Sequence, residues 1–189
     1  MPGKNNFPGF SLLELVLAMA IVAMLVAVAL PNVMKLLPKY EQKAFITNVN
    51  SYLAEAWQQG LATQKIQKIV FDLAKRQVYV EQETDELDPV TQEPVFKTAL
   101  MSYAPKRVDW PESFEVRQFF VQGVDELSAH STKNAVWFFL LPGGMAQEVI
   151  INILDTKNPP AGQDGRTFSL VLNPYTVQFK TYVDFQNPS

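Results

Sequence analysis

The sequence predicts an α+β protein in which a long N-terminal helix packs on an antiparallel β-sheet head. Three observations lead to this fold class: an apolar run near the N-terminus, a helical stripe of apolar residues after it, and pairs of β-type segments separated by turn residues in the remainder. The length of 189 residues, with 48% apolar and 19% charged residues, is typical of a folded chain and excludes a disordered one.

Composition removes most soluble-enzyme chemistry. The chain has no cysteine and one histidine, which excludes disulfide scaffolds and thiolate chemistry and leaves little room for a zinc site or a histidine general base. Its net charge of −3 argues against nucleic acid as the main partner, because phosphate binding needs clustered Lys and Arg. We therefore expect no enzyme, no cofactor and no metal centre.

The first predicted element is an apolar helix. Residues 15–30 carry no polar side chain and would form a helix of about 24 Å, whereas a start at Phe10 gives about 31 Å, the thickness of a membrane's hydrocarbon core. The longer segment contains Glu14. A carboxylate at membrane depth costs roughly 2.5–3.5 kcal/mol, so a compensating partner is expected for it.

The junction before this helix carries the most specific pattern. Residues 1–9 hold one Lys and no acid, Gly9 and Phe10 follow, Glu14 is the fifth residue counted from Phe10, and Pro31 is the twenty-second. This segment resembles the class III signal of type IV pilins and type II secretion pseudopilins.

The resemblance implies cleavage between Gly9 and Phe10 by a prepilin peptidase that also N-methylates Phe10. It implies further that the Phe10 amine pairs with Glu14 of a neighbouring subunit, which is far cheaper than leaving either charge alone in an apolar stem. Pro31 is expected to kink the helix, since it removes a backbone hydrogen bond.

Two alternatives compete with this interpretation. The first is an ordinary secretory signal peptide, for which Ala27 and Ala29 provide a small-x-small site. The single Lys before the apolar run and the acid that opens the run argue against it. The second is a plain signal anchor with an incidental Glu14. Intramembrane acids are rare, so the pilin-type signal is favoured.

A second helical segment follows the apolar run. Its apolar residues recur at helical spacing and predict a helix half-buried against the head: Phe45, Val49, Tyr52, Leu53, Ala56, Trp57 and Leu61. We expect this helix to end within residues 64–68. The chain is thus divided into a leader (1–9), a transmembrane and assembly helix (10–32), an amphipathic stem helix (33–66) and a periplasmic β-rich head (67–189).

The head is predicted to contain three hairpins. Residues 69–73 and 77–81 form the first, 136–141 and 148–154 the second, and 167–172 and 177–183 the third, each across a short turn. This order resembles the H-class minor pseudopilins, with Phe139 to Gly143 and Asn173 to Thr176 at the family's characteristic turns. Val177 stands where that family usually has Gly, and the I, J and K classes stay open.

Other candidate sites receive plainer interpretations. Residues 81–93 hold six acids, which indicates either a calcium loop or, more simply, a solvated acidic loop, since the spacing and glycine of a calcium loop are missing. His130 lies in a polar stretch without a catalytic signature, and Gly143 belongs to a turn and not to a phosphate loop.

Together these features predict a structural subunit, a minor pseudopilin of a type II secretion pseudopilus that helps to export folded proteins across the outer membrane. The expected partners are other pseudopilins in a helical filament, the prepilin peptidase and methylase, the inner-membrane platform and the membrane, with no nucleic acid. The expected location is the inner membrane, single-pass, with a periplasmic head. The alternative is a type IV minor pilin in pilus assembly or DNA uptake; Arg166 and Lys180 are the basic residues of the last thirty.

Overall fold

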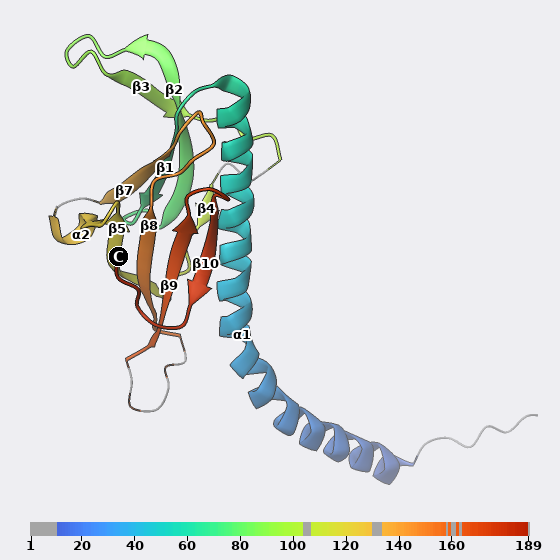
Figure 1. Cartoon of the computed structure of the whole chain (residues 1–189). Coiled ribbons are helices and arrows are strands. Elements are labelled where there is room, and N and C mark those ends of the chain that lie inside the picture. Colours follow the sequence, from blue (N-terminus) through green and yellow to red (C-terminus); the bar gives the residue numbers. More distant parts are fainter. Residues whose placement is uncertain are drawn as a thin grey trace, which may run out of the picture. The chain divides into compact units, whose positions relative to one another are not determined.

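The computed structural model describes residues 11–103, 107–129, 134–157, 159, 162 and 164–188, with residues 28, 29 and 31–39 described by their backbone alone. Its chain divides into two compact units, Met1–Tyr40 and Glu41–Ser189. Helix α1 (Leu12–Thr63) contributes to both units, and the sheets belong to the second (Figure 1). The predicted α+β class is confirmed.

The first sheet, sheet A, has the strand order β3-β2-β1-β7, and β4 pairs with β2. Its strands are β1 (Gln67–Asp72), β2 (Gln77–Leu87), β3 (Pro94–Thr98), β4 (Val108–Asp109) and β7 (Ala135–Leu140). The predicted hairpin of residues 69–73 and 77–81 is confirmed, with Ile69 opposite Val80.

The second sheet, sheet B, has the strand order β10-β9-β8-β5-β6. Its strands are β5 (Phe114–Val121), β6 (Val124–Asp125), β8 (Val149–Asp155), β9 (Arg166–Asn173) and β10 (Gln178–Tyr182), and a short helix, α2 (Glu126–Ala129), follows β6. The third predicted hairpin is confirmed, because β9 and β10 pair antiparallel with Gln178 opposite Asn173.

The predicted second hairpin is wrong, although both of its strands exist. β7 pairs with β1 in sheet A, and β8 lies between β5 and β9 in sheet B, so both edges of β8 are occupied. The turn between them carries the chain from one sheet to the other. A bridge between Leu140 and Ala146 and a few hydrogen bonds, such as the one from the Leu141 N–H to the Met145 carbonyl oxygen (2.7 Å), link its two sides. Trp57 of α1 donates a hydrogen bond from Nε1 to the Gly144 carbonyl oxygen (2.9 Å) and so anchors this crossing to the helix.

The core lies between the inner faces of the two sheets and the second half of α1. Aromatic rings dominate it: Phe71 of β1 meets Phe119 of β5 edge-on at 5.2 Å, and Phe45 of α1 meets Trp110 at 4.9 Å. Five residues of the predicted helical stripe are buried, namely Phe45, Val49, Tyr52, Leu53 and Ala56.

The predicted stripe fades toward the end of the helix. Trp57 is only half-buried and Leu61 is 39% exposed. The helix ends at Thr63, and Gln64 then adopts a left-handed φ of 56° that turns the chain into β1. Among the described side chains of this helix, burial therefore comes chiefly from residues 45–56.

Candidate functional site

The start of α1 is the first part of the candidate site. Ser11 precedes the helix, and its hydroxyl oxygen accepts a hydrogen bond from the backbone N–H of Glu14 (3.2 Å). Ser11 is therefore the N-cap, which satisfies one of the amide groups that the first turn leaves without a partner. The cap went unnoticed in the sequence although the spacing of Ser11 and Glu14 is that of a capping box.

Glu14 itself lies in the first turn of α1, where the helix dipole favours an acid. The other residues predicted to act with it, Gly9 and Phe10, lie outside the described residues, as does the leader. Pro31 lies within the backbone assigned to α1, and its side chain is outside the description. The roles predicted for Gly9, Phe10, Glu14 and Pro31 stay predictions.

The start of α1, residues 12–27, presents an exposed surface that is apolar except for Glu14. Each described side chain from residue 11 to 27 is exposed, with Leu12 at 83% and Met24 at 73%. An exposed apolar surface of this extent marks a contact with lipid or with other protein. No helix within the described part of the chain meets the length and apolarity that a membrane crossing requires.

The acidic stretch of residues 81–93 is a strand and a hairpin turn, so the expected solvated loop is wrong for its first half. Residues 81–87 continue β2, which pairs with β3. Several of its acids face lysines: Glu81 lies 3.1 Å from Lys68 and Asp85 lies 2.9 Å from Lys65. Gln82 and Thr84, which alternate with the first of these acids, are polar as well, and none of residues 81–87 is buried.

Asp88 shapes the turn of this hairpin. Its carboxylate accepts hydrogen bonds from the backbone N–H groups of Thr91 and Val90, and these bonds lower the pKa of Asp88 below its usual value. Across the described residues, which include all of 81–93, no three acidic or histidine side chains come together as a metal site. His130 lies outside the described residues.

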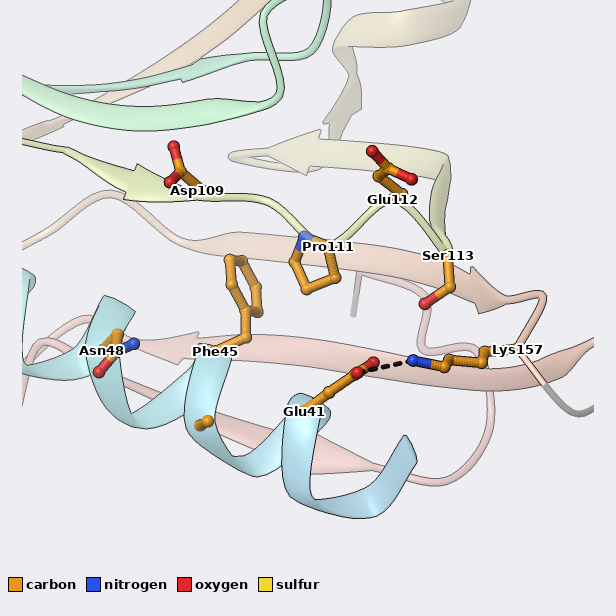
Figure 2. A pocket seen from close by; sticks show the side chains of 9 residues that line it. Glu41, Phe45, Asn48, Asp109, Pro111, Glu112, Ser113 and Lys157 are labelled. Carbon is orange, nitrogen blue, oxygen red and sulfur yellow. Dashed lines mark hydrogen bonds and ion pairs between the residues drawn. The ribbon is translucent and has the colours of Figure 1, made fainter. Parts of the chain in front are cut away.

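A cavity of about 700 Å³ opens beside α1 in the second unit (Figure 2). Its floor is apolar, with Ala44, Phe45 and Pro111, and its rim carries Glu41, Asp109 and Glu112. Figure 2 shows Glu41 reaching toward Lys157, whose ammonium lies 2.6 Å from Glu41 Oε1.

The wall of this cavity is held by the guanidinium of a half-buried arginine. Arg76 donates from Nη2 to the carbonyl oxygens of Pro111 and Phe114, and Trp110 donates from its backbone N–H to the Arg76 carbonyl oxygen (2.8 Å). Next to Lys157, the backbone N–H of Thr156 donates a hydrogen bond to the carbonyl oxygen of Ser113 (2.9 Å). The rim is consequently part of the folded head.

Three side chains that join α1 to the head were not anticipated. Asn50 pairs with the backbone of Phe179 through two hydrogen bonds: its Nδ2 donates to the carbonyl oxygen (3.1 Å), and its Oδ1 accepts from the N–H (2.8 Å). Glu55, 8% exposed, accepts hydrogen bonds from the N–H groups of Ser102 and Tyr103. Tyr52 accepts one from the N–H of Val80 (3.2 Å).

Comparison with known protein families identifies the N-terminal segment. The family model for the prokaryotic N-terminal methylation motif matches residues 4–30. The chain therefore carries the N-terminal motif of prepilin-type proteins, which is the resemblance that Gly9, Phe10 and Glu14 indicate. No curated protein matches the chain.

Solved structures similar to the chain include two of the minor pseudopilin EpsH from the type 2 secretion system of Vibrio cholerae. The first is 9% identical over 75% of this chain and 95% of that chain, and the second is 10% identical over 73% and 93%. Both TM-scores are 0.47. At this level of similarity, neither structure assigns a role to any residue of this chain.

Proposed function

We propose that the chain is a structural subunit of a pilus-like filament, specifically a minor pseudopilin of the H class that serves type II secretion. The observation that carries the proposal is the methylation motif at residues 4–30, which includes the exposed apolar residues at the start of α1. Further along, the same helix forms one wall of a β-rich head. This arrangement suits a subunit that stores an apolar stem in lipid and packs it in a bundle when the filament forms.

In this proposal the chain is inserted once into the inner membrane, with its head in the periplasm. The prepilin peptidase cleaves between Gly9 and Phe10 and methylates the Phe10 amine, which keeps its positive charge. Transfer from lipid to the stem bundle changes apolar burial little, so a specific contact must favour it. The pairing of that amine with Glu14 of a neighbour supplies such a contact, and the head meets other minor pseudopilins or the outer-membrane channel.

Mass spectrometry of the membrane-extracted protein tests the first step. The expected terminus is N-methylated Phe10, and replacement of Gly9 by Leu should leave the full chain uncut in the membrane. Replacement of Gly3 by Leu, within the same leader, is the matched control and should leave cleavage intact. A mature terminus at Leu30 would contradict the proposal and support an ordinary signal peptide.

The second step is tested at Glu14. Glu14→Ala should leave insertion and cleavage intact, since removing an acid makes the segment more apolar. It should reduce crosslinking to neighbouring pseudopilins and secretion by more than about a hundredfold, because an unpaired buried charge costs roughly 3–5 kcal/mol. Leu13→Ala, which keeps the acid, is the control. Equal crosslinking and normal secretion in Glu14→Ala would show that Glu14 has no such role.

One further assay separates the secretion subunit from a DNA-uptake pilin. If the head captured DNA, a gel-shift with the purified protein would show binding that weakens steeply with salt. We expect no shift, since the acidic residues outnumber the basic ones, 19 to 16.

A further inference from the structure

Sheet B buries two polar side chains on the face that points away from the core. Asn152 of β8 and Ser169 of β9 lie opposite each other in the register, and both are completely buried. Their neighbours along the strands, such as Ile151 and Leu170, belong to the core, so the alternation of a strand turns Asn152 and Ser169 outward. Buried polar groups on an outer face require a covering segment that satisfies them.

The covering segment is the stretch after β10, residues 183–188, which we call the tail. It crosses the outer face of β9 and β8 toward β5 (Figure 1). Asn152 binds both backbone groups of Gln186: its Nδ2 donates to the carbonyl oxygen (2.9 Å), and its Oδ1 accepts from the N–H (3.1 Å). Ser169 donates from its hydroxyl to the carbonyl oxygen of Asp184 (2.9 Å).

These contacts recognise an extended backbone and not a particular side chain. Among the described residues, each hydrogen bond between the tail and Asn152 or Ser169 involves a backbone atom of the tail. The side chains of the tail contribute little burial, because Val183 is 77% exposed and Phe185 is 38% exposed. A segment of different sequence can therefore make the same bonds in the same place.

A β-bulge shapes the site on its third strand. The register between β5 and β8 shifts between Val116 and Gln118, so Arg117 is the extra residue of β5. The shift brings Gln118 opposite Asn152, where Gln118 Oε1 accepts a hydrogen bond from Asn152 Nδ2 (2.8 Å). This bond holds the Asn152 amide in the orientation that meets a backbone carbonyl group with Nδ2 and a backbone N–H with Oδ1.

The tail can leave this site without disturbing the sheet. β8 pairs with β5 on one side and with β9 on the other, so the ladders of sheet B do not depend on the tail. When the tail leaves, water can bind the uncovered side chains of Gln118, Asn152 and Ser169. Opening of the tail should therefore need much less free energy than unfolding of sheet B.

We propose that Gln118, Asn152 and Ser169 form a binding site for an extended peptide segment of another protein, and that the tail occupies this site until such a segment displaces it. The occupant is selected by its backbone: one residue supplies an N–H and a carbonyl group to Asn152, and the residue two positions earlier supplies a carbonyl group to Ser169. The tail itself is an occupant of this kind. The inference goes beyond the proposed function and does not depend on it, because the site involves no residue of the methylation motif.

Amide hydrogen exchange of the intact full-length protein in micelles tests whether the tail opens by itself. The N–H of Gln186 should exchange at least about a hundredfold faster than that of Ile151, which lies in the central strand β8. The matched control is the N–H of Phe179, which also donates to an asparagine side chain, that of Asn50, but belongs to a strand and should exchange slowly. Equal rates for Gln186 and Ile151 would mean that the tail leaves only on global unfolding, which overturns the inference.

Peptide binding tests the exchange itself. The full-length chain is ended after Tyr182, and a fluorescent peptide of residues 183–189 is added as the probe. The peptide should bind the shortened chain at least about tenfold more tightly than the intact chain, in which the attached tail competes for the site. If circular dichroism shows the shortened chain to be unfolded, the tail is instead removed after folding, at a protease site placed between Tyr182 and Val183.

Three altered peptides show what the site recognises. Methylation of the backbone nitrogen of Gln186 removes the N–H that Asn152 accepts and should weaken binding at least about tenfold. The matched peptide with Gln186→Ala keeps that N–H and should bind within about threefold of the original. A third peptide, with threonine at positions 183, 185 and 186, has the same backbone and different side chains, and should bind within about tenfold.

Each outcome decides the inference separately from the proposed function, which is tested at the N-terminus. Failure of the original peptide to bind the folded, shortened chain overturns the inference. An equal loss with Gln186→Ala and with the methylated backbone would show that a side chain is recognised, which overturns it as well. Failure of the threonine peptide alone would show that the site accepts only the tail of this chain, and would overturn the choice of another protein as the occupant.

Discussion

Asn50 closes the free edge of sheet B, and its replacement by Ala should destabilise the head markedly. β10 is the edge strand, paired on one side with β9, and the backbone N–H and C=O of Phe179 point to the other side. The Asn50 side chain occupies that side with both of its polar atoms, at 2.8 and 3.1 Å from the Phe179 backbone. A single amide thus takes the place of a neighbouring strand.

The expected loss can be worked out from these two bonds. Each contributes about 1 kcal/mol to stability. Because Phe179 is only 4% exposed, water can replace the lost partners only in part. Asn50→Ala should therefore lower the free energy of unfolding by about 2–3 kcal/mol. For a domain of this size the melting temperature should fall by roughly 4–10 °C.

The assay is denaturant unfolding of a fragment of residues 38–189, followed by circular dichroism. This fragment should be soluble and unfold cooperatively, because the buried part of α1 stays with both sheets. Asn48→Ala is the matched control, because Asn48 is the same residue type, lies in the same turn of α1 and is exposed. It should change the free energy of unfolding by less than about 0.5 kcal/mol. Equal stability of the two variants would refute the argument that Asn50 satisfies the strand edge.

Three further predictions concern local contacts. Gly165→Ala should cost about 1–3 kcal/mol in the same unfolding assay, since a Cβ would come within 2.7 Å of Leu154 Cδ1, while Gly143→Ala, with open space around it, should be close to neutral. Burial raises the pKa of Tyr52 above 10.0, so the native state holds the proton more tightly than the unfolded state does; stability is present below about pH 10 and falls as the pH rises above it. Tyr52→Phe should show a shallower alkaline loss, and an unchanged slope would contradict this. Ser11→Ala should speed amide exchange in the first turn of α1 in micelles, whereas Ser11→Asp, which keeps a capping oxygen, should not.

The parts of the fold that could be predicted from the sequence are those fixed by local chemistry. The stripe from Phe45 to Ala56 and the turn at Asn173 each depend on residues close together in the chain, and both are confirmed. At that turn the Asn173 side chain accepts hydrogen bonds from the N–H groups of Tyr175 and Thr176. Spacing alone is enough to indicate features of this kind.

Strand pairing across the core was harder to predict from the sequence. A short turn between β7 and β8 favours a hairpin, but both strands have buried faces and each finds its partners elsewhere, so turn length did not decide the pairing. β5 was overlooked for a different reason. A register shift between Val116 and Gln118 moves its buried positions from Phe114 to Phe119, which breaks the period-two pattern by which strands are recognised.

The candidate site divides in the same way. Gly9, Phe10 and Glu14 form a compact sequence signal, and the methylation motif match covers all three. The cavity beside α1 joins Glu41, Glu112 and Lys157, which are far apart in the sequence and meet only through the fold. Nothing in the order of the residues places Lys157 next to Glu41.

Val177 is a position where the sequence resemblance can be compared with the backbone geometry. The H-class resemblance implies Gly at this position, and the structure shows why: the residue has a left-handed φ of 52°, which costs a β-branched side chain roughly 1–2 kcal/mol. Val177 is also completely buried, and burial of such a side chain contributes about 1.5–3 kcal/mol. The two terms are of similar size, so valine replaces glycine here at little net cost to stability. The departure at Val177 therefore preserves the backbone turn that a glycine would form.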